Sequence, residues 1–187
     1  LDTGITPCEA GVFPMAFRHF SAARPDPAHG NKVAQVLMNV APACELYVGQ
    51  VMGDASRSWE PIIQGVRWAQ EIGADVLNMS FACPSSHQAV DTLLGELDQK
   101  GCICVASFNA YYHWPHWLEP VISVGQDNQR GDMDVRASGE VIVTLGGHGV
   151  AFKGSSPAAA VVSGIAACAK AHDRSIGRNA FLAALSG

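Results

Sequence analysis

The sequence contains few charged residues and no concentration of positive charge. Only 16% of its 187 residues are Asp, Glu, Lys or Arg, and 12 basic against 17 acidic side chains give a net charge of −5. Proteins whose main partner is a nucleic acid carry a basic patch or stripe. No apolar run approaches the roughly 20 residues of a membrane-spanning helix, and no signal peptide opens the sequence. We therefore expect neither a nucleic-acid partner nor a membrane span.

Cysteine pairs with the spacing of a zinc site are also lacking. The six cysteines stand at positions 8, 44, 83, 102, 104 and 168, and none forms a Cys-x-x-Cys pair. Several lie in apolar runs, where free thiols behave as small hydrophobic residues, so we expect a reduced, cytoplasmic protein, with secretion as the alternative. His113 and His116 invite a metal interpretation, but aromatic residues flank both and no third ligand is near. We expect a packed loop there.

Hydrophobic periodicity is what the sequence does have, and it predicts helices that alternate with strands. Hydrophobic residues make up 48% of the chain, enough for one domain with a sizeable core. The alternation indicates a compact α/β fold of three layers, with a mainly parallel sheet and helices on both faces. We expect strands at 45–52, 75–81, 102–106, 121–125 and 141–145, helices at 31–40, 59–72, 87–100, 178–185 and from 155 onward, and loops at 6–28, 126–139 and 146–149.

The chain is organised around a serine at the start of a small-residue helix. Lys153-Gly154-Ser155-Ser156-Pro157 forms a turn, and an alanine-rich apolar helix follows at once. The free N–H groups and the positive dipole end of such a helix stabilise developing negative charge beside the hydroxyl. This is the arrangement that a nucleophilic hydrolase needs, although a serine N-cap on an ordinary buried helix has the same local sequence.

Two upstream segments favour the hydrolase. Asp2-Thr3-Gly4-Ile5 is typical of the turn at the end of a buried strand, and the strand itself is expected before Leu1. His29-Gly30 stands at the start of an apolar helix. The order Asp, His, Ser is that of the subtilisin-type triad. Three motifs also resemble those of the subtilisin-like (subtilase) family. They are Asp-Thr-Gly-Ile at residues 2–5, His-Gly-x-x-Val-Ala at residues 29–34 and Gly-Ser-Ser-Pro-Ala at residues 154–158. The resemblance implies a single subtilisin-like peptidase domain over residues 1–187, without its first strand.

The resemblance also implies a role for each motif residue. Ser156 is the nucleophile, His29 its general base, and Asp2 the residue that orients the imidazole and stabilises its positive charge. Asn109 follows an apolar strand, as the family's oxyanion-binding asparagine does, and is expected to donate to the oxyanion together with the Ser156 amide. No cofactor is implied, and the shortened segment between residues 36 and 41 leaves no acidic loop for a structural calcium ion.

A peptide or protein substrate is expected to bind as an added, extended strand. By resemblance, two segments flank it. They are Ser56, Arg57 and Ser58 on one side and Ser80, Phe81, Ala82 and Cys83 on the other. Phe108 replaces the family's glycine before the oxyanion asparagine, so we expect a shallow pocket for the residue preceding the cut; the alternative is that Phe108 turns into the core and leaves the pocket open.

Three functions remain open at this level. A serine endopeptidase is the first, and a transpeptidase or macrocyclase that resolves the acyl-enzyme with an amine is the second, because the two differ only in the second step. In the second case the aromatic loop at residues 111–118 would exclude water or hold a leader peptide. A catalytically silent scaffold is the third. The oligomeric state is not determined by the sequence.

Overall fold

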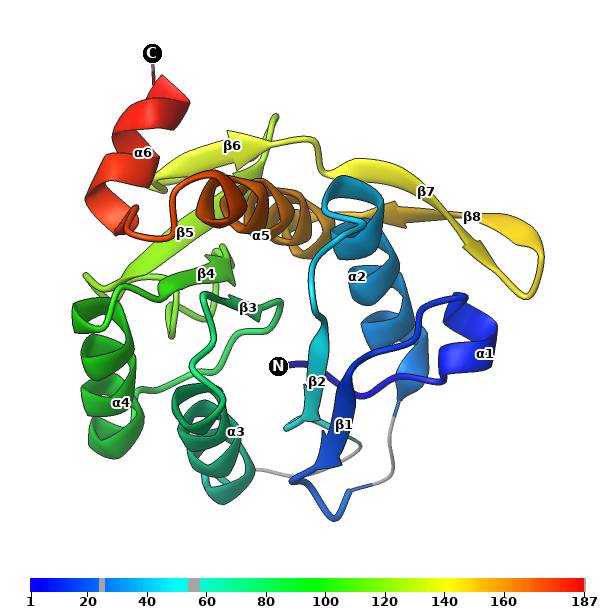
Figure 1. Cartoon of the computed structure of the whole chain (residues 1–187), viewed down its shortest axis with the longest axis horizontal. Coiled ribbons are helices and arrows are strands. Elements are labelled where there is room, and N and C mark those ends of the chain that lie inside the picture. Colours follow the sequence, from blue (N-terminus) through cyan, green and yellow to red (C-terminus); the bar gives the residue numbers. More distant parts are fainter. Residues whose placement is uncertain (24–25, 54–57, 187) are drawn as a thin grey trace.

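The computed structural model describes residues 1–23, 26–53 and 58–186, apart from the side chains of residues 8 and 10 (Figure 1). The helices are α1 (Pro7–Ala10), α2 (Pro27–Val40), α3 (Glu60–Glu71), α4 (Gln88–Gln99), α5 (Ser155–His172) and α6 (Arg178–Ser186). The strands are β1 (Ala16–His19), β2 (Tyr47–Gln50), β3 (Val76–Met79), β4 (Ile103–Ser107), β5 (Val121–Gln126), β6 (Val135–Ala137), β7 (Glu140–Leu145) and β8 (His148–Lys153). Within the described ranges, no helix is both long and apolar enough to cross a membrane.

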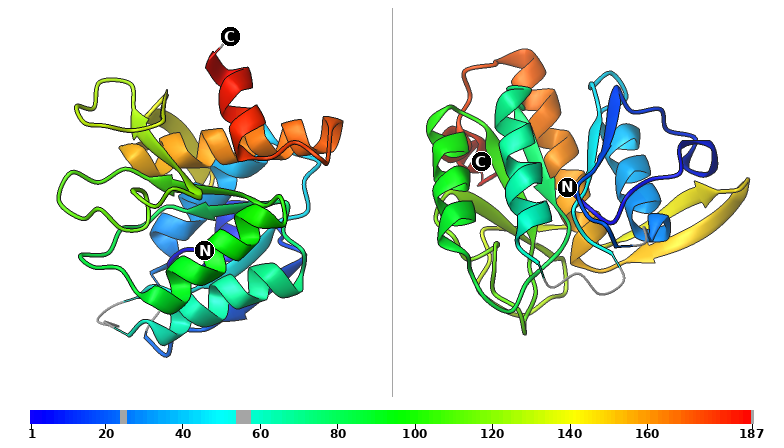
Figure 2. Two further views of the ribbon diagram at one scale, coloured as in Figure 1. Left: turned by 90° about the vertical axis from the view of Figure 1, so that its left-hand side faces the viewer. Right: turned by 90° about the horizontal axis from the view of Figure 1, so that it is seen from below.

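The central sheet has the order β3-β4-β5-β6, and all its strands are parallel. Alternate side chains of β4 point to opposite faces, as the two-residue period of a strand requires. Ile103 and Val105 pack against α5 and α6, whereas Cys104 and Ala106 pack against α3 and α4. Figure 2 shows the sheet between α5 on one side and α3 and α4 on the other. The predicted three-layer α/β fold is confirmed.

A second parallel pair, β1-β2, stands beside this sheet. Among the described residues, no backbone pairing joins β2 to β3 directly. Leu1 and Asp2 lie between them: the Leu1 ammonium donates to the carbonyl of Asn78 at 2.7 Å, and Asp2 forms a parallel bridge with Gln50. A cavity of about 790 Å³ continues between the two strands, lined also by α2, α3 and α5. The fold thus consists of two blocks, one built on β1, β2 and α2 and the other on β3–β6 and α5.

The two blocks meet where α2 packs against α5. The two helices approach closely at Gly164, since a Cβ atom added there would lie 2.6 Å from the Cβ of Val40. The small residues of α5 therefore let its axis approach α2 more closely than larger side chains would permit.

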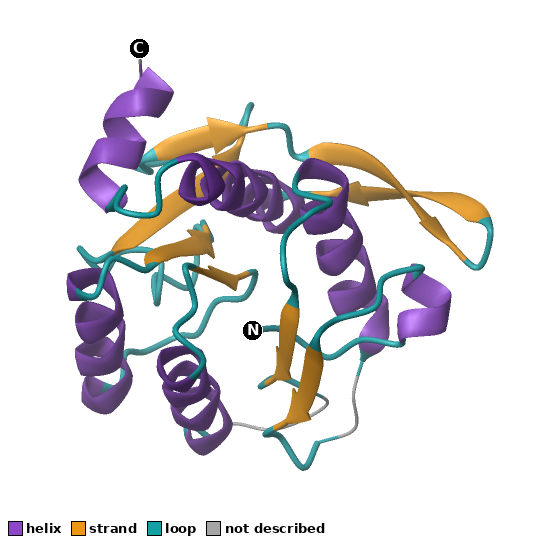
Figure 3. Cartoon of the chain, in the orientation of Figure 1, coloured by secondary structure: helices purple, strands orange, loops and turns teal. Residues whose placement is uncertain are grey.

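Several short elements differ from the sequence predictions. The expected loop at residues 6–28 contains α1, β1 and the first residues of α2, which begins at Pro27 with Asp26 as its N-cap. The expected loop at 126–139 contains β6, and the expected turn at 146–149 opens β8, which pairs antiparallel with β7. The resulting hairpin extends beyond α2 (Figure 3). Strand β1 forms through pairing with the distant β2, and β6 and β8 form through pairing with β5 and β7, so the local periodicity of these short segments does not reveal them.

Candidate active site

Asp2 and His29 form a close, directed pair at the end of β2. Asp2 is buried, and its Oδ1 accepts a hydrogen bond from His29 Nδ1 at 2.7 Å and another from the Thr3 amide at 2.7 Å. Its Oδ2 is buried with no hydrogen-bond partner among the described residues. The carboxylate accepts and cannot donate, so the proton of the neutral imidazole sits on Nδ1. Nε2 is therefore left with a lone pair, as a general base requires.

The surroundings of His29 act on its pKa in opposing directions. Burial lowers the pKa, but the hydrogen bond to Asp2 and the charge of Asp2 raise it more, so the net pKa is above 6.5. Lys32 opposes this rise through its positive charge, and its Nζ lies 5.6 Å from the ring centroid of Phe152. The imidazole meets the same Phe152 ring edge-on at 5.5 Å. Phe152 thus fixes the ring against β8, four residues before Ser156.

The N-terminus of α2 is held against the loop that carries Asp2. Thr3 Oγ1 donates to the Asp26 carbonyl at 2.5 Å and accepts from the Gly30 amide at 3.3 Å. A Cβ atom on Gly30 would lie 1.8 Å from the carbonyl oxygen of Gly4, which is backbone and cannot give way. The glycine after His29 is therefore required by the close approach that brings His29 to Asp2.

Replacement of Gly30 by alanine is expected to destabilise the fold by about 1–3 kcal/mol, the usual effect of overpacking. It is also expected to lower the peptide hydrolysis predicted from the sequence by about 10²-fold, because a displacement of roughly 1 Å at a catalytic group has that effect. Gly95→Ala in α4 is the matched control: its added Cβ meets nothing within 4 Å, and removing a helix glycine stabilises by about 0.5–1 kcal/mol. Urea denaturation and peptide hydrolysis measure both variants. Equal stability and rate in Gly30→Ala and wild type would contradict the prediction.

Ser156 lies in the first turn of α5, at the carboxyl end of β3. Gly154 before the helix has φ of 118°, a conformation that favours glycine. Ser156 Oγ donates to the Ser80 carbonyl at 3.3 Å, and Ser80 Oγ donates to the Ser156 carbonyl at 3.2 Å. Within the described residues, no hydrogen bond joins Ser156 to His29; such bonds are often long until substrate binds. The Ser156 amide belongs to the first turn, whose N–H groups have no intrahelical partner.

Asn109 follows β4, and its side chain is held by the loop that comes after it. Its Oδ1 accepts hydrogen bonds from the amides of Tyr111 and Tyr112, both at 2.9 Å. Nδ2 makes no hydrogen bond with another described residue, so it remains a donor for a ligand. β3 and β4 are parallel neighbours, with Met79 opposite Ala106. Asn109 and Ser80, the partner of Ser156, therefore follow strand ends at the same edge of the sheet.

Of the two segments predicted to flank the substrate, the structure describes residues 80–83 fully but only Ser58 of the other. Ser56 and Arg57 lie outside the described residues, and Ser58 is exposed, with its Oγ accepting from the Glu60 amide. On the other side, Ser80 is buried and Phe81 and Ala82 are half-buried. Cys83 is buried, and its amide donates to the Trp114 carbonyl at 2.8 Å, so this amide is not available to a substrate strand. Burial raises the pKa of the Cys83 thiol to about 11, which keeps it protonated.

Phe108 is buried directly before Asn109. Its ring centroid lies 4.8 Å from that of His116, and a Cβ atom on Gly131 would lie 2.4 Å from Phe108 Cζ. The ring is thus held between two loops, and its position relative to Asn109 is fixed.

The sequence predicts a packed loop around His113 and His116, but it does not show which side chains of that loop support this edge. Trp114 is buried, and its Nε1 donates to Asp91 Oδ1 at 2.6 Å, while Trp59 meets it edge-on at 5.0 Å. His116 is also buried and bonds to the carbonyl of Asn109 at 3.2 Å. The aromatic residues around positions 111–118 were the available signal, because so many large side chains in one loop indicate packing.

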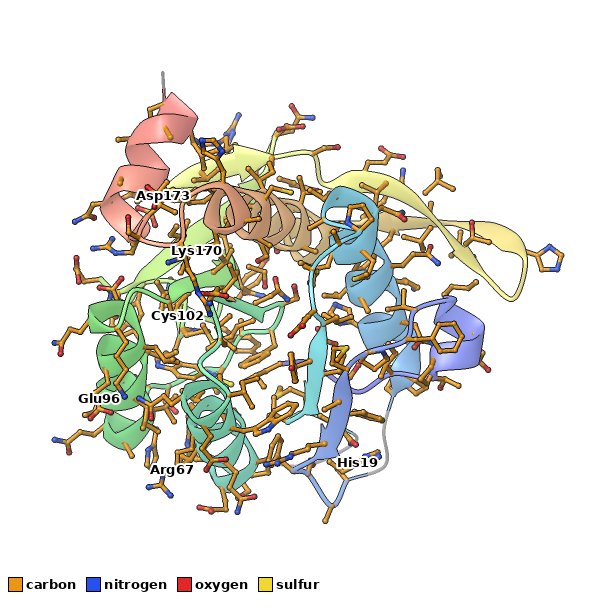
Figure 4. The ribbon with its side chains drawn as sticks, in the orientation of Figure 1. His19, Arg67, Glu96, Cys102, Lys170 and Asp173 are labelled. Atoms are coloured by element: carbon orange, nitrogen blue, oxygen red, sulfur yellow. The ribbon has the colours of Figure 1, made fainter. Side chains whose placement is uncertain are left out.

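Lys170 is a buried titratable residue outside the predicted site. It is labelled in Figure 4, and its Nζ donates to the carbonyls of Gly101 and Arg174 at 2.6 and 3.0 Å. Gly101 lies before β4, so this lysine closes the edge of the sheet opposite Asn109. Across the described part of the chain, no three His, Cys, Asp or Glu side chains are grouped so as to hold a metal ion.

A comparison with protein families assigns the chain. The family model described as "Subtilase family" matches residues 19–185. The chain belongs to the subtilase family. Subtilisin amylosacchariticus from Bacillus subtilis subsp. amylosacchariticus is 29% identical over 172 residues, covering 75% of this chain and 45% of that protein. M-protease from Shouchella clausii is 27% identical over 168 residues, covering 76% of this chain and 44% of that protein. This subtilase therefore spans less than half the length of these relatives.

Solved structures give the same fold. A cold-adapted subtilisin-like serine proteinase superposes with a TM-score of 0.82 at 20% identity, covering 97% of this chain and 77% of that one. The prenylagaramide maturation protease PagA superposes with a TM-score of 0.66 at 19% identity, covering 81% and 73%. The two superpositions agree with a subtilisin-like architecture for this chain.

Proposed function

We propose that this subtilase is a serine endopeptidase, with Ser156 as nucleophile, His29 as general base, Asp2 as the residue that orients and stabilises the imidazole, and Asn109 as an oxyanion donor. The observation that carries the proposal is the 2.7 Å hydrogen bond from His29 Nδ1 to buried Asp2 Oδ1. A buried carboxylate on Nδ1 gives the tautomer and the raised basicity that a serine hydrolase uses.

The reaction follows from these assignments. Ser156 Oγ attacks the carbonyl carbon of the peptide bond while His29 Nε2 takes the hydroxyl proton, and Asp2 stabilises the imidazolium. The oxyanion accepts hydrogen bonds from the Ser156 amide and from Asn109 Nδ2. As the tetrahedral intermediate collapses, the C–N bond breaks and the imidazolium protonates the leaving amine. Water then attacks the ester with the same base, which restores the Ser156 hydroxyl and releases the acid.

The substrate of this proposal is an extended peptide lying beside Phe81 and Ala82, with its pocket bounded by Phe108. Ser58 is the described residue of the opposite flank, and no cofactor takes part. The five cysteines whose side chains are described are free thiols. This supports a reducing, cytoplasmic location as part of the proposal.

A fluorophosphonate probe tests the proposal directly, because it reacts covalently only with an activated serine. Wild type and Ser155→Ala are expected to be labelled, and Ser156→Ala is expected to remain unlabelled. Ser155 is a matched control, since it is the neighbouring hydroxyl in the same helical turn and is equally half-buried. Absence of labelling in folded wild type would favour the catalytically silent scaffold, and labelling that is lost only in Ser155→Ala would reassign the nucleophile.

The transpeptidase or macrocyclase is the second candidate, and the aromatic loop favours it. Tyr111 is 87% exposed and Trp117 is 66% exposed, and both belong to the loop that follows Asn109. Large exposed aromatic side chains beside a reacting centre can bind peptide and exclude water from the acyl-enzyme. The ratio of aminolysis to hydrolysis, measured with a peptide ester and a competing amine, separates the two candidates. If only hydrolysis is observed, and if its rate is unchanged in Tyr111→Ser and Trp117→Ser, the transpeptidase is excluded and the endopeptidase remains.

Phe108 is expected to restrict the residue that precedes the scissile bond. A phenylalanine at the family's glycine position fills volume beside Asn109, so the pocket is expected to accept small or medium side chains and to disfavour Phe and Tyr. A methylene more or less in such a pocket changes binding by about 1–3 kcal/mol. A peptide library with that residue varied, run on wild type and on folded Phe108→Gly, measures the effect. Preference for large aromatic residues in wild type, unchanged in Phe108→Gly, would contradict the prediction.

A further inference from the structure

The side chain of His116 is enclosed by the protein, although His116 belongs to the same loop as Asn109. Only 5% of the residue is exposed, and both ring nitrogens have partners. Nε2 lies 3.2 Å from the carbonyl oxygen of Asn109, and Nδ1 lies 3.3 Å from Ser123 Oγ. A carbonyl can only accept, so Nε2 carries the proton, and Nδ1 then accepts from the Ser123 hydroxyl.

Ser123 links this histidine to the rigid sheet. It lies in β5 opposite Ala106 of β4, and its own amide donates to Asp134 Oδ2 at 2.8 Å. A continuous chain of hydrogen bonds therefore runs from the central sheet through Ser123 and His116 to the main chain of Asn109. The Phe108 ring packs on the imidazole and closes the site on another side.

Asn109 is thereby held at two points. Its side-chain oxygen is fixed by the amides of Tyr111 and Tyr112, and its main-chain oxygen is fixed by His116. Once both oxygens are held, the side-chain torsions have little freedom, and Nδ2 is presented in one direction. An oxyanion donor acts through such preorganisation, because it then needs no rearrangement when charge develops.

We infer that His116 is a positioning residue for the oxyanion donor: through its hydrogen bond to the Asn109 carbonyl it orients Asn109 Nδ2. The inference rests on the proposed function, in which Asn109 donates to the oxyanion. It also assigns the two histidines of the loop different roles. His113 is exposed, whereas His116 acts from within the protein and touches no substrate.

The test is a double-mutant cycle on peptide hydrolysis. His116→Phe keeps a ring against Phe108 but removes both hydrogen bonds. We expect kcat to fall at least tenfold with KM nearly unchanged, and to fall no further than the about 10²–10³-fold loss expected for Asn109→Ala. In the Asn109→Ala background, His116→Phe is expected to change kcat by less than about threefold, because a residue that acts through Asn109 has nothing left to position. His116→Gln, which retains an N–H donor, is expected to recover part of the loss.

His113→Phe is the matched control, since its ring centroid lies 6.0 Å from that of His116 in the same loop. It is expected to retain the wild-type kcat. If His116→Phe does not fold, Ser123→Ala replaces it in the cycle: it removes the partner of Nδ1, and a smaller fall in kcat, again absent in the Asn109→Ala background, is expected. Effects that multiply independently in the double variants, or an unchanged kcat in the single ones, would overturn the inference.

Fluorophosphonate labelling separates this result from a failure of the proposed function. Wild type that is labelled at Ser156, together with a normal kcat in folded His116→Phe, would overturn the inference alone. Folded wild type that is not labelled would overturn both, since no oxyanion would then form.

Discussion

Peptide hydrolysis is expected to fall by about 10⁶-fold in kcat when Ser156 is replaced by alanine, and by a similar factor in His29→Ala. The magnitude is the one established for subtilisin when either group is removed. The physical reason is that the hydroxyl and the base act as a unit, so either deletion removes the whole nucleophilic pathway. Initial rates on a peptide substrate at saturating concentration measure the effect, with circular dichroism showing that the variants are folded.

Two controls make this expectation specific. The double variant Ser156→Ala/His29→Ala is expected to be no slower than either single variant, because the unit is already lost. Ser155→Ala, which changes the adjacent hydroxyl in the same turn of α5, is expected to keep near-wild-type rates. An inactive Ser155→Ala beside an active Ser156→Ala would show that the nucleophile has been assigned to the wrong serine.

Asp2→Asn is expected to lower kcat by about 10⁴-fold, as the corresponding change does in other serine proteases. An asparagine amide can donate to Nδ1, which stabilises the tautomer with the proton on Nε2 and removes the base. The pH profile is expected to change as well. In wild type, His29 must be deprotonated, and its pKa is raised by Asp2, so kcat/KM rises with pH through a midpoint above 6.5. Without Asp2, burial and Lys32 still lower the pKa, and the midpoint moves to lower pH.

Lys32→Gln is the matched control for this pH dependence, with the opposite sign. The positive charge of Lys32 lowers the pKa of His29, so its removal is expected to move the midpoint to higher pH while kcat changes little. Profiles of kcat/KM recorded at constant ionic strength between about pH 5 and 9 measure both shifts. A midpoint that stays in place in both variants would mean that His29 is not the titrating base.

The sequence predicted the candidate site best where its residues form short contiguous motifs. The serine turn before α5 and the His29-Gly30 pair were visible as local patterns, and the structure shows why: Gly30 is excluded from carrying a Cβ, and Gly154 has positive φ. Strand β4 was predicted because a buried parallel strand has a near-continuous apolar sequence, and β3 and β5 were predicted as strands that alternate with helices.

The rest depended on tertiary contacts that no local pattern shows. β1 is only four residues long and half polar, so its identity comes from pairing with β2. β6 and β8 are likewise defined by their neighbours. The hydrogen bond from His116 to Asn109 joins residues of one loop, but no periodic pattern encodes it, and only the burial of the ring distinguishes His116 from His113.

The two-block construction has a consequence for how inactivation relates to unfolding. Asp2 and His29 lie beside β2 and at the start of α2, whereas Ser156 and Asn109 lie on the block of β3–β6 and α5, and α2 packs against α5 at Gly164. Catalysis depends on sub-ångström alignment, while helicity depends on hydrogen bonds inside each block. A slight separation of α2 from α5 would therefore abolish turnover, while the far-ultraviolet circular dichroism spectrum would stay native. Enzymatic assay and circular dichroism would then report different transitions on heating, with loss of turnover as the earlier one.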